Sequence, residues 1–395
     1  MAQHAARLLL DQNWSEISRL FENRQPHGAD EYCVRALLNL YRGKGSPDWS
    51  GVIGDLRQSC EIKPTDPLLH CNLAQALLDS GQRDEAYTTA ERTRNAYPNS
   101  LPALEKHVLA AVATQRWALA YGSLVHAKNL LGNKQRMPDW AANLLAELSC
   151  QWWLPLEAGG VVLRTPDASD APFLKETFRD AAFMQHYHRF QGASDEAVES
   201  FISSARLSPR QAGRMDWVIL DRNHVRVGLF AFVDIDWRND RGEILIGLPG
   251  NREATTALKA SVAAMVFAFE RLGLQKIVSY VYADNPQAQA NTLHLGFVQE
   301  GLLRSHINGG EAGRLDIFVN GMTSSDFANN SFVSGLARRW VQKPFGNPNI
   351  TPSAESTQGK DADFGTGGNI KALVTFTPVN GGAYYVGVQD FSTAA

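Results

Sequence analysis

The sequence predicts a multidomain protein with an all-α array of helical hairpins, an α/β domain with one central sheet, and a short Gly-rich β-like tail. Three observations predict this fold class. The 395 residues exceed a single domain of about 150 residues. Apolar residues recur at helical spacings up to about residue 148 and at strand-like spacings from residue 161. After residue 343, Pro, Asn, Ser and Gly replace both patterns, which indicates a linker.

Charge and cysteine content argue against several classes of protein. The 38 basic and 41 acidic residues leave a net charge of −3, so a general electrostatic hold on nucleic acid or anionic membrane is not expected. No run of about 18 apolar residues predicts a membrane-spanning helix, and the first residues lack a signal-peptide pattern. The cysteines show no C-x-x-C spacing, so neither a zinc site nor a disulfide framework is indicated. We therefore expect a cytoplasmic protein without a metal, nucleic-acid or membrane partner.

Residues 1–150 are predicted to form stacked helical hairpins. Helical runs at 71–78 and 86–91 are separated by a short turn, and a Pro-bearing turn follows the second run. Pro64 and Pro98 lie 34 residues apart, as do two alanines of successive hairpins, Ala86 and Ala120. The stretch from residue 66 to 99 resembles the tetratricopeptide repeat, with these signature positions: Leu73, Ala74, Gly81, Ala86, Ala90 and Pro98. An irregular helical bundle is the alternative interpretation.

Residues 151–160 are predicted to connect the two domains, with Trp152 and Trp153 packed on one of them. In the domain that follows, at 161–325, helices and strands alternate, which favours one central sheet. Helices are predicted at 171–178, 195–205, 255–272 and 286–294, the second with Ser194 as its N-cap. Strands are predicted at 161–164, 215–220, 225–233, 243–247, 276–282, 297–305 and 313–319.

The last part of the chain is predicted as a helix and linker at 326–360 and a tail at 361–395. The tail has strand-like runs at 370–376 and 383–388. Two strands cannot build a core alone. The tail therefore docks elsewhere, is an incomplete β-unit, or is disordered.

Short segments of the α/β domain, in this order, resemble the GNAT acyltransferases: Val162-Leu163-Arg164, Asp167–Ala171, Gly228, Glu243–Gly247, Phe267–Leu274, Asp284-Asn285, Leu295-Gly296-Phe297, Glu300–Arg304 and Gly313–Asp316. The most similar branch acetylates the N-terminal amines of ribosomal proteins, with amino-sugar and antibiotic acetyltransferases as relatives. The resemblance implies a mixed, mostly antiparallel sheet. It also implies an acetyl-CoA-dependent N-acetyltransferase whose acceptor is a protein N-terminus, an amino sugar or a carrier-linked amine.

A turn at a helix N-terminus suits the anionic pyrophosphate of coenzyme A, because free backbone N–H groups gather there. The resemblance places this turn at 248–256 and implies these cofactor-binding residues around it: Leu245, Ile246, Arg252, Ala254, Thr255 and Thr256. The turn is shorter than in the family, and Glu253 and Thr255 stand at positions where glycine is expected. Glycine permits left-handed turns and close approach of a ligand. The altered turn therefore puts the affinity for coenzyme A in question.

Glu243 and Asn285 are the remaining candidates that the resemblance implies. Glu243 stands where relatives have a strand-borne carboxylate that accepts the proton of the substrate amine, directly or through water. The alternative interpretation is that Glu243 is a solvated charge at the end of a strand. Asn285 stands where the family hydrogen-bonds the pantetheine arm of the cofactor, and it is also suited to cap a helix before Pro286. Ala288 and Thr292 replace a Ser and a Tyr of many relatives.

His186 and His188 have a spacing that can ligate metal, but no third ligand lies at a useful spacing, so surface or packing roles are predicted. Two functional hypotheses follow. In the first, an amine attacks the thioester directly, since no nucleophilic Cys or Ser is positioned to form an acyl-enzyme, and the helical repeats hold a protein or peptide substrate. In the second, a catalytically degenerate scaffold binds a protein or small ligand.

Overall fold

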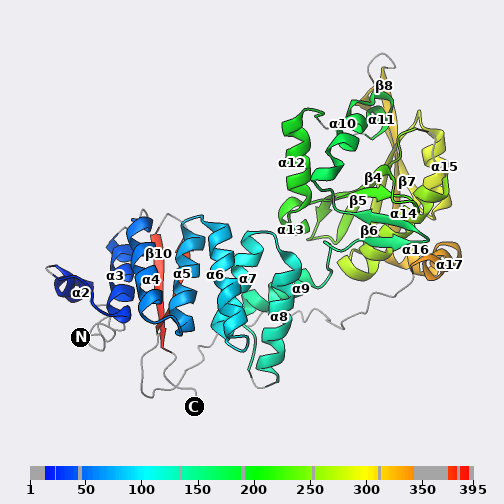
Figure 1. Ribbon diagram of the computed structural model, residues 1–395. Helices are drawn as coiled ribbons and strands as arrows, with labels where there is room; N and C mark the ends of the chain where they lie inside the picture. The colour runs from blue at the N-terminus through cyan, green and yellow to red at the C-terminus, as the bar shows by residue number, and fades with distance from the viewer. Residues whose placement is uncertain are drawn as a thin grey trace. The chain divides into compact units, whose positions relative to one another are not determined.

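The computed structural model describes residues 14–22, 24–42, 47–133, 135–187, 192–250, 254–309, 313–341, 372–379 and 383–390. The chain divides into two compact units, residues 1–145 with 352–395 and residues 146–351. The described part of the first unit contains helices and one β-hairpin, and the second contains an eight-stranded sheet covered by helices (Figure 1). Within the described ranges, no helix has both the length and the apolar character needed to cross a membrane.

The helices of the first unit follow one another side by side in chain order (Figure 1). Several begin at a strong N-terminal signal: the Asp66 carboxylate accepts a hydrogen bond from the Leu68 amide at 3.1 Å, and a proline takes the first helical position. These helices are α2 (Trp14–Phe21), α3 (Ala29–Arg42), α4 (Trp49–Ile62), α5 (Pro67–Asp79), α6 (Arg83–Ala96), α7 (Leu101–Ala113), α8 (Trp117–Leu131) and α9 (Asp139–Leu148), the last of which crosses the boundary between the units.

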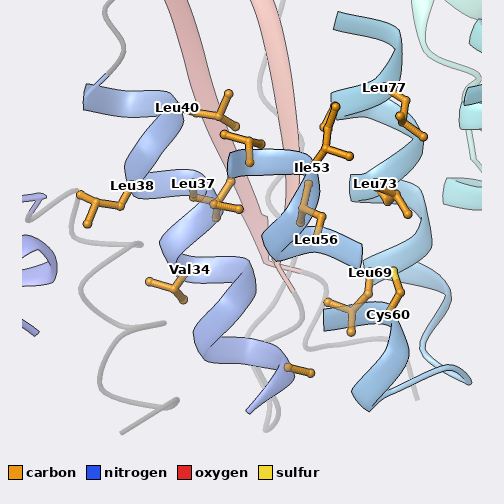
Figure 2. Close-up of a cluster of buried hydrophobic side chains, with 14 of the residues drawn as sticks. Val34, Leu37, Leu38, Leu40, Ile53, Leu56, Cys60, Leu69, Leu73 and Leu77 are labelled. Atoms are coloured by element: carbon orange, nitrogen blue, oxygen red, sulfur yellow. The ribbon is translucent and has the colours of Figure 1, made fainter. Parts of the chain in front are cut away.

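Helices α3, α4 and α5 share a hydrophobic cluster, shown in Figure 2. Leu37, Ile53 and Leu73 are among its members, and each is at most 5% exposed. Full burial of one such side chain contributes about 1.5–3 kcal/mol. At the edge of the cluster, Arg35 binds both carboxylate oxygens of Asp55, at 2.5 and 2.8 Å. The helices of this unit are thus held by packing and by a two-point ion pair.

The hairpin of the first unit consists of two antiparallel strands, β9 (Ala372–Val379) and β10 (Ala383–Asp390). The two strand-like runs predicted in the tail fall on these strands. The predicted linker at 343–360 lies outside the described residues.

The second unit is built on one sheet with the strand order β1-β2-β3-β4-β5-β6-β8-β7, in which only β5 and β6 run parallel. The prediction of a mixed, mostly antiparallel sheet is therefore confirmed. The strands are β1 (Leu156–Ala158), β2 (Val161–Arg164), β3 (Met215–Leu220), β4 (Arg226–Asp236), β5 (Arg241–Gly247), β6 (Lys276–Tyr282), β7 (Val298–Asn308) and β8 (Arg314–Thr323).

Strand β1 corrects one prediction. It lies in the segment that was predicted to be only a connector, and it pairs antiparallel with β2. Leu156 and Ala158 are buried and Glu157 is exposed, so the alternation of a half-buried strand is present. Three residues are too few for that alternation to be recognised in a sequence.

Helices cover both faces of the sheet. On one face, apolar side chains of α10 (Ala171–Arg179), α11 (Ala181–His186) and α12 (Asp195–Ala205) pack on β3, β4 and β5. Elsewhere, α14 (Ala254–Val266) continues as the π-helix η2 (Phe267–Leu272), whose Phe267 ring meets Trp217 of β3 edge to face. The remaining helices are η1 (Ala168–Asp170), α13 (Pro209–Ala212), α15 (Pro286–His294), α16 (Ser324–Asn329) and α17 (Ser331–Trp340). The sequence did not predict α11 or α13.

The start of the second unit is fixed by a buried carboxylate. Asp170 is fully buried; two nitrogens of Arg164 donate to its oxygens at 2.7 Å each, and Arg226 of β4 donates at 2.5 Å. Burial alone would raise the pKa of Asp170. The hydrogen bonds from Arg164, the Asp167 amide and Arg226 outweigh burial and hold that pKa below its usual value. These residues therefore connect β2, η1 and β4.

Candidate active site

The parallel strands β5 and β6 stay together for only three residue pairs, the last of which is Glu243 with Val278. Beyond this point β5 pairs only with β4, as far as Gly247, and β6 pairs only with β8, as far as Tyr282. The facing edges of the two strands therefore carry main-chain groups that the sheet does not pair with each other. A cavity of about 420 Å³ lies at this parting.

The cavity is lined by the diverging strands and by parts of three helices. Its lining combines apolar and aromatic side chains with hydroxyl, amide and imidazole groups, which can fix the orientation of a small molecule. The residues are Ala182, Phe183, His186, Tyr187, Ile244, Leu245, Ile246, Gly247, Leu248, Ser261, Ser279, Tyr280, Val281, Tyr282, Asn285, Gln287, Ala288, Asn291, Thr292, Leu295 and Phe297.

Helix α11 approaches the end of β5 because position 247 is glycine. A Cβ atom at Gly247 would lie 2.5 Å from Phe183 Cε2, closer than real Cβ atoms approach a neighbour, and 3.0 Å from Tyr187 Cδ2. The two rings stack with centroids 5.1 Å apart. Tyr187 is 6% exposed, and burial together with the charge of Asp216 raises its pKa. The hydroxyl therefore stays protonated. Both rings line the cavity.

A second glycine brings the end of β5 close to β4. A Cβ atom at Gly228 would lie 2.5 Å from the carbonyl oxygen of Gly247 and 3.0 Å from Leu248 Cγ. Because one of these neighbours is backbone, a side chain at 228 would displace the strand end. Gly228, which contributed to the resemblance, thus has a packing role beside the cavity.

Helix α15 forms the wall that follows β6. The Asn285 side chain accepts a hydrogen bond from the Ala288 amide at 3.0 Å, so it caps the helix while it lines the cavity. On its buried side, Gln289 and Asn320 of β8 exchange two amide hydrogen bonds, both 2.9 Å. Asn320 is fully buried. This reciprocal pair fixes α15 on the sheet and thereby sets the width of the cavity.

We expect Asn320→Leu to lower the free energy of unfolding by about 1–3 kcal/mol, because it leaves the buried Oε1 of Gln289 without its donor. The Nε2 of Gln289 still donates to Gln299 Oε1 at 3.1 Å. The double variant with Gln289→Leu is expected to be less destabilised than the two single changes added together. Urea unfolding of the four proteins of this cycle measures the coupling. Strict additivity would contradict the role given to the pair.

Some of the predicted cofactor-binding residues lie together at the cavity. Leu245, Ile246 and Asn285 line the cavity. Ala254, Thr255 and Thr256 form the first turn of α14, with Thr255 exposed and Thr256 buried. Arg252 and Glu253 lie outside the described residues.

The predicted base Glu243 lies in β5 at the last residue pair before the strands part. It is 2% exposed and is not among the cavity-lining residues, although the next residue, Ile244, is. A substrate in the cavity would therefore reach its carboxylate only through an intervening group such as water. Its catalytic role stays a prediction.

His186 was predicted to be a surface or packing residue, and the structure places it in the cavity lining. Its Nε2 lies 3.8 Å from Asp284 Oδ1, and its ring lies 6.5 Å from the ring of Tyr282, measured between centroids. The four-residue spacing of Phe183 and Tyr187, which places both on one helix face, was the available sequence signal for α11. His188 lies outside the described residues, and the ranges that are described hold no group of three potential metal ligands.

Residues 161–298 match the family model described as an acetyltransferase (GNAT) domain. The chain contains a GNAT acetyltransferase domain. All cavity-lining residues lie within the matched range. The protein is accordingly an acyltransferase enzyme, and the parting of β5 and β6 is the candidate active site of its GNAT domain.

Several solved structures are similar to the GNAT domain. A spermidine N-acetyltransferase from Vibrio cholerae in complex with CoA and spermine is 22% identical, with a TM-score of 0.39, over 43% of this chain and 99% of that one. A chimeric form of a Vibrio cholerae spermidine N-acetyltransferase is 23% identical, with a TM-score of 0.38, over 44% and 100% of the chains. A probable acetyltransferase is 19% identical, with a TM-score of 0.39, over 43% and 97%. Among curated proteins, none matches this chain.

Proposed function

We propose that the protein is an acetyl-CoA-dependent N-acetyltransferase that acts on a primary amine. The observation that carries the proposal is the cavity between the parted strands of the GNAT domain. The pantetheine arm of coenzyme A contains amides, and the edges of 244–247 and 279–282 offer backbone groups that the sheet leaves available on the cavity side. Asn285 and Ser279 add polar side chains to the same lining.

The pyrophosphate is proposed to lie at the N-terminus of α14. This helix has 13 residues, and a helix N-terminus of that kind favours an anion through its free amides and its dipole. The amides of Ala254, Thr255 and Thr256 belong to this first turn. Bound acetyl-CoA would supply the thioester, and the chain's own residues would position it and exclude water.

The reaction is proposed to be a direct attack. The amine nitrogen forms a C–N bond with the acetyl carbonyl carbon, and the C–S bond breaks. One proton leaves the nitrogen and one reaches the sulfur, so the products are an amide and the free thiol. The lining contains no cysteine, so no thiol is placed there to form an acyl-enzyme.

We also propose that the helical region is a tetratricopeptide-like array that holds a protein or peptide acceptor. The start of α7 lies 34 residues after that of α5, α8 follows α6 by 34 residues, and α6 follows α4 by 34. Ala86 and Ala120, at equivalent positions, are both fully buried, which suits close helix packing. The spacing supports the repeat array itself. The proposed acceptor is a protein N-terminus in the cytoplasm, and amino sugars and carrier-linked amines are the other acceptors to test.

Arg252 provides a test of the pyrophosphate site. Arg252→Ala is expected to weaken coenzyme A binding by about 1.5–3 kcal/mol through loss of a charge-assisted contact. Changing Glu253 and Thr255 together to Gly should strengthen binding, because repulsion and backbone constraint are relieved. If the contact is to the pyrophosphate, Arg252→Ala weakens acetyl-CoA and acetyl-dephospho-CoA equally. Unchanged affinity in both variants would refute this assignment.

The acceptor is tested by release of free thiol from acetyl-CoA. Peptides with free N-termini, amino sugars and carrier-linked amines serve as acceptors, and the same compounds blocked as tertiary amines serve as controls. We expect thiol release and an acetylated product only with the free amines. Binding of acetyl-CoA without transfer to any of these acceptors would contradict the proposed function.

A further inference from the structure

The imidazole of His186, in the cavity lining, lies near the carboxylate of Asp284, which comes from a distant part of the sequence. His186 ends α11, and Asp284 follows the last residues of β6. The Nε2 of His186 lies 3.8 Å from Asp284 Oδ1, and both side chains remain partly exposed, at 38% and 32%. His186 lines the cavity and can therefore contact a solute that enters it, whereas Asp284 is solvent-accessible beside it but is not among the lining residues.

Glu243 is less accessible to a solute in the cavity than His186 is. Glu243 is 2% exposed and lies where β5 and β6 are still paired. His186 lines the cavity directly. A general base must reach the proton it removes within hydrogen-bond distance or through one water. Of the two side chains, only His186 is among the residues that line the cavity in the described structure.

We infer that His186 is the catalytic residue that accepts the proton of the substrate amine and that Asp284 is a positioning residue for its ring. The inference rests on the proposed function. The amine N–H bond breaks as the nitrogen lone pair attacks the thioester carbon, and the proton passes to a ring nitrogen of His186. The Asp284 carboxylate then stabilises the resulting imidazolium. The C–N bond forms as the C–S bond breaks, and the departing thiolate takes up a proton from solvent to give the free thiol. His186 then releases its own proton to solvent, so the enzyme returns to its starting state.

The groups around His186 suit this role. Among the described residues, Asp284 faces it from the loop before α15, and Tyr282 faces it from β6. Tyr187 follows it on the chain, and its raised pKa keeps it neutral. The Arg214 and Asp216 side chains near Tyr187 pair with each other at 2.6 Å. The charged group that faces the imidazole is thus the Asp284 carboxylate, at 3.8 Å.

The test compares His186→Gln, Asp284→Asn and Glu243→Gln in the full chain, with acetyl-CoA and an acceptor amine found by thiol release. His294→Gln is the matched control, because His294 lies on the exposed side of α15 against Phe332 and outside the cavity. Titration with acetyl-CoA shows whether each variant keeps its cofactor affinity and therefore its fold.

We expect His186→Gln to lower kcat by about 10²–10⁴ with unchanged acetyl-CoA affinity, and to remove the acid limb that an imidazole base gives to the pH profile between about pH 5 and 8. Asp284→Asn should lower kcat less, again with unchanged acetyl-CoA affinity, while His294→Gln has no effect. A loss below tenfold in His186→Gln, or an unmoved acid limb, overturns the inference even if Glu243→Gln is inactive. Absence of transfer by the unaltered enzyme overturns the proposed function and this inference with it.

Discussion

Asp170→Asn is expected to lower the free energy of unfolding of the second unit by about 3 kcal/mol. The substitution keeps the size of a fully buried side chain but removes the charge that Arg164 and Arg226 share. Breaking a buried ion pair from one side costs several kcal/mol, because the remaining charge is left without its partner. The two arginines keep 22% and 33% exposure, which places the cost at the lower end of the usual range.

Urea unfolding measures this cost, and Asp195→Asn is the control. Asp195 pairs with Lys175 at the surface, where solvent screens the pair and its contribution to stability is small. A loss in Asp170→Asn no larger than in the control would contradict the role given to Asp170. The expected dependence on pH follows from the lowered pKa of Asp170. A carboxyl group whose pKa is lower in the folded than in the unfolded protein stabilises the fold at pH values above its unfolded pKa. That stabilisation disappears as the pH falls through the folded pKa.

Ala288→Trp is expected to weaken acetyl-CoA binding at least about 100-fold, a loss of roughly 2.7 kcal/mol, and to abolish transfer. Ala288 lies in the cavity lining on α15, so a large ring there would occupy the space proposed for the pantetheine arm. Ala290→Trp is the matched control, since Ala290 is on the same helix but exposed and outside the lining. Isothermal titration measures both. Equal binding by the two variants would show that acetyl-CoA lies elsewhere.

The elements of the second unit could largely be predicted from sequence because their patterns are local. The predicted strand at 215–220 agrees with β3, and the predicted helix at 195–205 agrees with α12. The side chain of Ser194 accepts a hydrogen bond from the Ala197 amide, as its predicted N-cap role requires. Strand β1 was missed because three residues are too short to show a period. Helix α11 has six residues, and the spacing of Phe183 and Tyr187 was its one sequence signal. Their stability comes from pairing with β2 and from packing over Gly247.

The site could be predicted only in part, because its geometry depends on where two distant strands separate. Leu245 and Asn285 were found through the resemblance, and both line the cavity. Burial of Glu243 is set by the pairing of β5 with β6, which no local pattern encodes. The approach of His186 to Asp284 joins residues almost a hundred positions apart. A sequence shows the chemistry of the two side chains but not that they lie close together.

Calorimetric titration of the full chain with acetyl-CoA tests most directly the claim that the parted strands of the GNAT domain hold this co-substrate. We predict saturable binding of one equivalent at micromolar or tighter affinity, with coenzyme A as a competitor and with binding lost in Ala288→Trp but kept in Ala290→Trp. No detectable heat or competition at millimolar acetyl-CoA, with a protein shown to be folded, would contradict the account.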